Sequence, residues 1–490
     1  MGFLMCKEDN GLGCLMKNSA SVELDSYFPV RHQRQEDVPK TRFKPRVGKT
    51  LSPRRWNAAF SQDGQLDIAG VLRRIQRGGI HPSIKGAVWE FLLGCYDPNS
   101  TFEERNEIRQ RRREQYAAWK TECKEMAPVI GSGKFITAAI ITDDGQPIIE
   151  TSVNGNLPDD FGGKPSDNGS ADKRVIQWKR SLHQIGLDVV RTDRILVFYE
   201  TEKNQAKLWD ILAVYSWFDG DIGYVQGMND ICSPMVILLD DEADAFWCFE
   251  RAMRRLRENF RCSTTSVGVQ SQLSTLAQII KTIDPKLHQH LEELDGGEYL
   301  FAFRMLMVLF RREFSFVDSL YLWEVMWAME YNPNMYLLYE EPNSSCQNGS
   351  QKINNKLLKL YGKFERKNVQ TGWTEQKTAL AVFVVASVLE TKNKRLLKEA
   401  KGLDDVVQIL GELTGNMDVK KAVKGALKIH KKYLSKVNFI ITRVLSAALG
   451  GCICCGYLSA AHHHSCRPRN HSCIRLQREC FTIGYILQQA

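Results

Sequence analysis

Two short segments of this sequence combine residues that can act together on a phosphoryl group. In the first, Asp188 and Arg191 lie three positions apart on an expected helix, where the carboxylate can orient the guanidinium. In the second, Gln226 precedes Gly227 on an expected turn. An arginine neutralises charge on a transferring phosphoryl group, and a glutamine orients the attacking water of GTP hydrolysis. A plain surface ion pair and an ordinary loop explain the same residues, so both interpretations stay open at this point.

The elements around these residues must hold them in place. Asp219-Gly220-Asp221 interrupts a helical pattern, and Asn229 and Asp230 are candidates to cap the helix that follows Gln226. The sequence matches no other catalytic motif that we considered. Gly131-Ser132-Gly133-Lys134 has the ending of a phosphate-binding loop, but Pro128 replaces its first glycine and Phe135 its Mg²⁺-binding Ser/Thr. We therefore expect no nucleotide site, metal site or cofactor of the chain's own.

The apolar periodicity predicts an all-α fold. Trp56, Ile68, Val71, Leu72 and Ile75 are spaced for one face of a helix that ends at Gly78-Gly79. Residues 208–215, 246–260 and 303–310 repeat this spacing, and 176–437 is mostly helical by the same criterion. A salt-bridged exposed helix is expected over 103–120, and further amphipathic helices over 374–389 and 403–436. No run of parallel strands and no solenoid repeat is present.

Composition changes divide the chain into three regions. Residues 1–50 are basic and lack periodicity, so we expect them to be disordered. Residues 51–437 form the helical domain. Turn signals crowd residues 128–173 and predict a flexible insert, with a short hairpin over 135–149. Residues 438–490 form a Cys/His-rich tail.

Charge and cysteine content exclude several classes of protein. The net charge of +9 comes largely from residues 31–55, which hold nine Lys/Arg against two acidic residues. The remainder is nearly neutral, which argues against a nucleic-acid-binding body. Scattered single cysteines suit a reducing compartment, and the N-terminus shows no signal-peptide pattern. We therefore expect a cytoplasmic protein. Its basic segments are compatible with peripheral attachment to endomembranes.

The two chemical segments resemble the paired finger motifs of TBC domains, the domains of Rab GTPase-activating proteins. The resemblance rests on Ile185-x-x-Asp188-x-x-Arg191 and Tyr224-x-Gln226-Gly227, in the family's order. It extends over about residues 51–334, through Gly78-Gly79-Ile80-His81-Pro82 and Trp89 at the start and Leu322-Trp323-Glu324 near the end.

This resemblance implies a large two-lobed helical domain that activates a GTPase without being an enzyme alone. Arg191 would be the arginine finger and Gln226 the glutamine finger, both supplied in trans to a Rab-type small GTPase in its GTP form. GTP and Mg²⁺ would belong to that partner. A non-catalytic Rab-binding adaptor or scaffold in membrane trafficking is the alternative. Ile185 and Asp188 would support the arginine finger, with Asp188 holding Arg191 in place. Tyr224, Gly227 and Asn229 would shape the glutamine loop.

Two positions depart from the family pattern. Lys85 stands where the family usually has arginine, and Glu324 stands where it usually has aspartate. Lysine lacks the planar guanidinium fork, so we expect a weakened contact and lower local stability at Lys85. The tryptophans 89, 209, 247 and 323 are expected in the core, and Arg311 and Arg312 in structural ion pairs.

Three functional interpretations of residues 438–490 stand beside that of a variable tail. Residues 444–461 lack charge but are a poor membrane span, because Gly and Ser dilute them. Cysteines and histidines of 452–473 fit no standard zinc spacing. Palmitoylated cysteines beside the basic helix are the third interpretation. We favour a variable tail that adds nothing to the fold.

Overall fold

The computed structural model describes residues 27–37, 39–135, 173–261, 268–340, 355–371 and 379–455, with the side chains of the last range described up to 437 and at Phe439. Within these ranges the chain is helical and has no β-strand, only three isolated bridges. The predicted all-α class is confirmed. The predicted hairpin, most of the insert and most of the tail lie outside the described residues.

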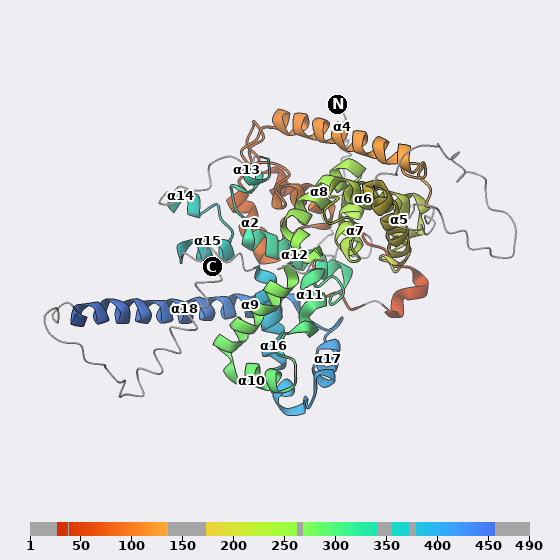
Figure 1. Ribbon diagram of the computed structural model, residues 1–490. Coiled ribbons are helices and arrows are strands. Elements are labelled where there is room, and N and C mark those ends of the chain that lie inside the picture. Colours follow the sequence, from red (N-terminus) through yellow and green to blue (C-terminus); the bar gives the residue numbers. More distant parts are fainter. Residues whose placement is uncertain are drawn as a thin grey trace, which may run out of the picture.

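The helices form two groups (Figure 1). The first group is α1 (Pro53–Asn57), α2 (Ile68–Gly78), α3 (Lys85–Leu92), α4 (Phe102–Met126), α5 (Lys173–Arg191), α6 (Glu202–Phe218), α7 (Met228–Leu238) and α8 (Glu242–Leu256). The second is α9 (Gly268–Ile283), α10 (Pro285–Glu293), α11 (Phe303–Met307), α16 (Leu380–Glu399), α17 (Leu403–Gly411) and α18 (Val419–Cys455). These are the two lobes that the family resemblance implies.

Helix α12 (Phe316–Glu330) joins the two groups, since it contacts α2 and α3 on one side and α16 and α18 on the other. All of its residues except the last are buried, as a helix at the centre of a domain requires. Three short helices flank it: α13 (Met335–Glu340), α14 (Asn355–Leu358) and α15 (Lys363–Gln370). Single 3-10 turns span His32–Asp37, Pro82–Ile84, Val197–Glu200, Arg257–Phe260 and Leu300–Ala302.

The predicted faces at 208–215 and 246–260 are buried, in α6 and in α8 with the 3-10 turn that follows it. The face predicted over 303–310 is wrong, because α11 ends at Met307 and Phe303 is exposed. Ile68, Val71, Leu72 and Ile75 are all buried on one face of α2, whose carbonyl end meets Gly79 at a φ of 69°. Trp56 belongs to the separate helix α1. The four tryptophans expected in the core are buried there.

Helix α4 forms as expected and begins with a capping box between Thr101 and Glu104. Its arginines make tertiary ion pairs instead of pairs along the helix. Arg112 contacts Glu340 at 2.7 Å, and Arg113 contacts Asp244 at 2.6 Å. The charge pattern therefore holds α4 against α8 and α13.

The structure differs from the sequence expectation at both ends of the domain. Residues 39–50 are ordered: Phe43 is buried, and the backbone amides of Arg42 and Phe43 donate to Asp318 of α12 at 2.9 and 2.7 Å. At the other end, α18 continues through the expected boundary at residue 437 to Cys455. No described helix is long and apolar enough to cross a membrane.

The two departures from the family pattern contact each other. Lys85 of α3 forms a fully buried ion pair with Glu324 of α12, and Trp89 Nε1 donates to the same carboxylate at 3.2 Å. Burial lowers the pKa of Lys85 and raises the pKa of Glu324, and their attraction opposes both shifts. The contact at Lys85 is thus not weakened as expected. The glutamate side chain at 324, longer than the usual aspartate, forms an ion pair with the lysine ammonium at 85.

Candidate functional site

The last turn of α5 positions Arg191. Ile185 and Val189 are buried and anchor the helix against its neighbours, while Arg191, the final residue, has 52% of its side chain exposed. Asp188 lies one turn earlier and is completely buried, and one of its oxygens pairs with the Arg191 guanidinium. A buried carboxylate next to a half-exposed guanidinium fixes the direction of the arginine without hiding it.

The turn after α6 positions Gln226. Helix α6 ends at Phe218, and Arg257 holds Asp219 through two hydrogen bonds of 2.7 Å. Gly227, the N-cap residue of α7, has a φ of 108°, and a Cβ there would lie 2.9 Å from Val308 Cγ1. Only glycine suits that position, both in backbone conformation and in space. Gln226, the residue before it, is exposed.

A hydrogen-bond network joins the two segments. Tyr224 Oη donates to Asp188 Oδ2 at 2.7 Å, and Asn229 Oδ1 accepts from the Gly227 amide at 3.0 Å. Asn229 Nδ2 donates to Thr192 Oγ1 at 2.8 Å, and that hydroxyl donates to the Asp188 carbonyl at 2.6 Å. The network therefore holds the arginine turn and the glutamine turn as one unit.

Every supporting residue expected from the sequence takes part in this arrangement. Ile185 anchors α5, Asp188 holds Arg191, and Tyr224, Gly227 and Asn229 form the second turn. Burial raises the pKa of Tyr224, and the neighbouring Asp188 charge raises it further, so the phenol stays protonated as a donor.

Sequence reasoning missed two features of the site. Thr192 was assigned no role, although its hydroxyl lies between Asn229 and the Asp188 carbonyl; its place directly after Arg191 was the available signal. The expectation that Asn229 and Asp230 cap α7 is also wrong. Gly227 is the N-cap residue, and Asp230 instead accepts two hydrogen bonds from Arg312.

The expected structural ion pairs are present beside the site. Arg312 contacts Asp230 at 2.8 Å, and Arg311 pairs with Asp193. Among the described residues, no group of three or more His, Cys, Asp or Glu side chains is placed to hold a metal ion. The Cys/His-rich residues 462–473 lie outside those ranges.

Fold and site together define a helical domain that presents an arginine and a glutamine from two linked turns. The family model "Rab-GTPase-TBC domain" matches residues 163–339, which contain both. The crystal structure of the Ypt/Rab-GAP domain of Gyp1p superposes with a TM-score of 0.50 at 17% identity, over 78% of this chain and 96% of that one. That likeness shows the fold.

Relatives match over more than half of this chain. Rab GTPase-activating protein 22 of Arabidopsis thaliana is 30% identical, over 57% of this chain and 66% of the relative. Human TBC1 domain family member 17 is 32% identical, over 59% of this chain and 39% of the relative. The aligned region is thus less than two thirds of either relative. These matches show that the chain is similar to proteins of the TBC-domain family.

Proposed function

We propose that this chain accelerates GTP hydrolysis by a Rab-type small GTPase, to which it supplies Arg191 and Gln226. The observation that carries the proposal is the linked pair of turns: each exposes one of the two groups that GTP hydrolysis needs, and buried hydrogen bonds hold both turns together. The family match and the name of the Arabidopsis relative support the same activity.

In this mechanism the chain is an activator, and the GTPase brings the nucleotide and Mg²⁺. Arg191 would neutralise charge on the γ-phosphoryl oxygens, and Gln226 would orient the attacking water in place of the GTPase's own glutamine. Pre-orientation of Arg191 by Asp188 lowers the ordering cost at the moment of reaction. We place this activity in the cytoplasm, at the surface of endomembranes.

The test is stimulated GTP hydrolysis with a panel of purified Rab-type GTPases. Arg191→Ala should slow stimulated hydrolysis by about 10³- to 10⁵-fold, because it removes the transition-state charge partner. Gln226→Ala should also be severely impaired. Arg191→Lys should not restore activity, since lysine offers a point charge without the planar fork.

Arg180→Ala is the matched control, because Arg180 is another exposed arginine of α5, about three turns before Arg191. It should keep near-full stimulation. Replacing the GTPase's own switch glutamine should cost less than Gln226→Ala. If Arg191→Ala stimulates a responsive GTPase as well as the parent does, the chain is a Rab-binding adaptor instead.

A further inference from the structure

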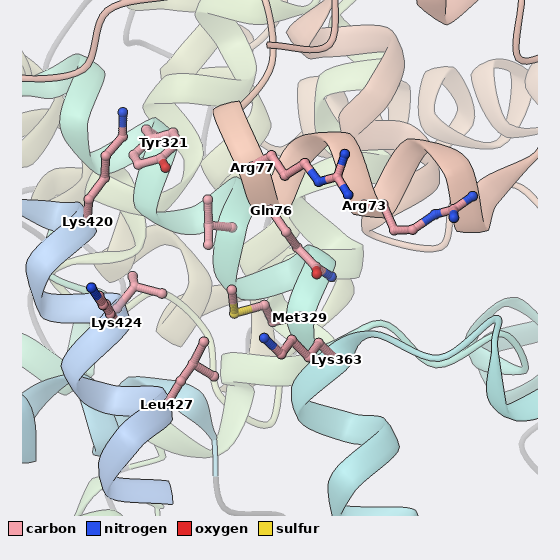
Figure 2. A pocket seen from close by; sticks show the side chains of 11 residues that line it. Arg73, Gln76, Arg77, Tyr321, Met329, Lys363, Lys420, Lys424 and Leu427 are labelled. Carbon is pink, nitrogen blue, oxygen red and sulfur yellow. The ribbon is translucent and has the colours of Figure 1, made fainter. Parts of the chain in front are cut away.

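A groove lined by basic residues lies between the two lobes, away from the turns that carry Arg191 and Gln226. Its volume is about 430 Å³, and α2, α12, α15 and α18 contribute its walls. Figure 2 shows Arg73 and Arg77 of α2 on one side and Lys420 and Lys424 of α18 on the other. Lys363, the first residue of α15, stands at the edge, and Tyr321 and Met329 of α12 form part of the floor. None of these residues belongs to the arginine or glutamine turn.

The groove concentrates positive charge. Its lining contains five cationic side chains and no carboxylate. In the part of the chain that the structure describes, none of the five lies within ion-pair distance of an acidic group; the ion pairs of this fold involve other residues. Arg73 Nε donates only to the Ala69 carbonyl at 3.2 Å, and Lys420 Nζ stands 5.6 Å from the Tyr321 ring.

Neighbouring cations strengthen this field. Burial lowers the pKa of Lys420, and the nearby charge of Arg46 lowers it further. The pKa of Lys367 is lowered by burial and then by Lys363 and Lys431. The acidic groups near Lys420 are Asp418 and Asp318, and Asp318 is already engaged by the backbone amides of Arg42 and Phe43. Like charges gathered around a hollow favour an anion that joins them.

The basic surface continues along α18 beyond the groove. Lys424, Lys428 and Lys431 follow one another at helical spacing and are exposed, on the same face as the groove residue Lys420. By contrast, Lys432 and Lys436 are engaged, because they donate to the carbonyls of Ile283 and Thr282 at 3.0 and 2.7 Å.

An exposed aromatic residue stands at the far end of this surface. Phe439 is 59% exposed, and it lies in a second hollow beside Lys428 and Lys431. The sequence of α18 contains no acidic residue between Val419 and Cys455. Figure 1 shows α18 extending outward from the helices that it packs against. Basic residues followed by an exposed aromatic residue are typical of helices that lie at a lipid surface.

We propose that the groove binds the phosphorylated headgroup of an anionic membrane lipid, with the exposed lysines of α18 against the same membrane surface. Arginines bind phosphate oxygens through two parallel hydrogen bonds, and lysines add point charges, so Arg73, Arg77 and the three lysines suit a headgroup with several phosphates. The groove has the size of a small-ligand site, which favours a headgroup over an acidic protein segment. This binding is separate from the proposed GTPase activation.

Vesicle sedimentation with the full chain tests the proposal. The parent should bind phosphatidylcholine vesicles that contain phosphatidylinositol bisphosphate, and should not bind vesicles of phosphatidylcholine alone. The triple variant Arg73→Gln/Arg77→Gln/Lys424→Gln should bind at least tenfold more weakly, because it removes three cations of the groove. All three side chains are exposed, so the melting temperature should stay at the parent value.

The matched control is Lys394→Gln/Lys398→Gln/Lys401→Gln, which removes the same charge from exposed positions at the end of α16. It should bind vesicles like the parent. Equal losses in both triple variants would overturn the groove as the site and indicate attraction by net charge alone. Binding of soluble inositol trisphosphate without vesicle binding would overturn the lipid assignment in favour of a free phosphate ligand.

The two proposals can fail independently. Hydrolysis assays in solution, without vesicles, should give the same stimulated rate for the parent and the groove variant. A groove variant that loses both vesicle binding and its melting transition would report unfolding. In that case the single variants Arg77→Gln and Lys424→Gln decide the question, and full vesicle binding by both of them would overturn the proposal.

Discussion

Asp188 divides its two carboxylate oxygens between Arg191 and Tyr224. One oxygen pairs with the guanidinium, and the other accepts a hydrogen bond of 2.7 Å from the Tyr224 hydroxyl. Because Asp188 is completely buried, each oxygen depends on its protein partner for compensation. Tyr224 thus acts on Arg191 only through Asp188, as a positioning residue.

Tyr224→Phe tests this role, because it keeps the ring and removes the hydroxyl that donates to Asp188 and, at 3.3 Å, to Asn229 Oδ1. Loss of a hydrogen bond to a buried charge should destabilise the fold by about 1.5–3 kcal/mol and lower stimulated kcat/KM by about tenfold. The decisive measurement is a double-mutant cycle with Arg191→Ala. If Tyr224 acts through the finger, Tyr224→Phe should cost little activity once Arg191 is gone. An unchanged tenfold loss in that background would contradict the role.

At the scale of elements, the α3–α12 contact depends on one buried ion pair. Glu324 accepts from Lys85, from Trp89 Nε1 at 3.2 Å and from the Ile80 amide at 3.3 Å. These donors come from α3 and the chain before it, and the acceptor comes from the central helix. The pair therefore fixes the start of the domain onto α12, although each residue alone departs from the family pattern.

Removal of one partner of the Lys85–Glu324 ion pair should strongly destabilise the fold. Glu324→Gln leaves the Lys85 charge buried without its counter-charge, so we expect a loss of about 3–5 kcal/mol in the free energy of unfolding by urea denaturation. Lys85→Arg and Glu324→Asp should each destabilise the fold when made singly. Together they restore the family's usual pair and should cost less than the sum of the two. Strictly additive losses would mean that the two positions are uncoupled.

At the scale of the whole molecule, His430 lies where α15, α16 and α18 meet. It is buried in α18, its ring lies 4.2 Å from that of Phe364 in α15, and Phe383 of α16 is 4.9 Å away. Its Nε2 contacts Asn368 Oδ1 at 2.8 Å. Burial, and then the Lys367 charge, lower the pKa of His430 from 6.5 to about 4.

This shift makes the stability of the fold depend on pH. Between pH 6.5 and about 4 the unfolded chain takes up a proton at this histidine that the folded chain resists. The free energy of unfolding is therefore unaffected by protonation of His430 above pH 6.5. It decreases as the pH falls below 6.5, by about 2 kcal/mol at pH 5. His430→Gln keeps a donor to Asn368 and cannot titrate. Its melting temperature should fall less than that of the parent between pH 7.5 and 5, whereas parallel curves would show that His430 does not contribute.

Several features of this protein are local, and the sequence alone determined them. Helical spacing identified the buried face of α2, because a periodicity of 3.6 residues reports directly which side chains share a face. The core tryptophans followed from side-chain type. Arg191, Gln226 and their supporting residues were found through ordered motifs, since each motif is a short contiguous stretch of one turn. Short-range spacing was sufficient in each case.

The tertiary structure alone decided which distant residues meet. The amide of Phe43 finds Asp318, 275 positions away, so a segment without periodicity becomes ordered through a partner that no local pattern reveals. Lys85 meets Glu324 across 239 positions, which turns two apparent weaknesses into a pair. The basic groove likewise exists only because α2, α15 and α18 converge on α12. Periodicity specifies the face that a helix buries, whereas packing of whole helices determines the residues that this face contacts.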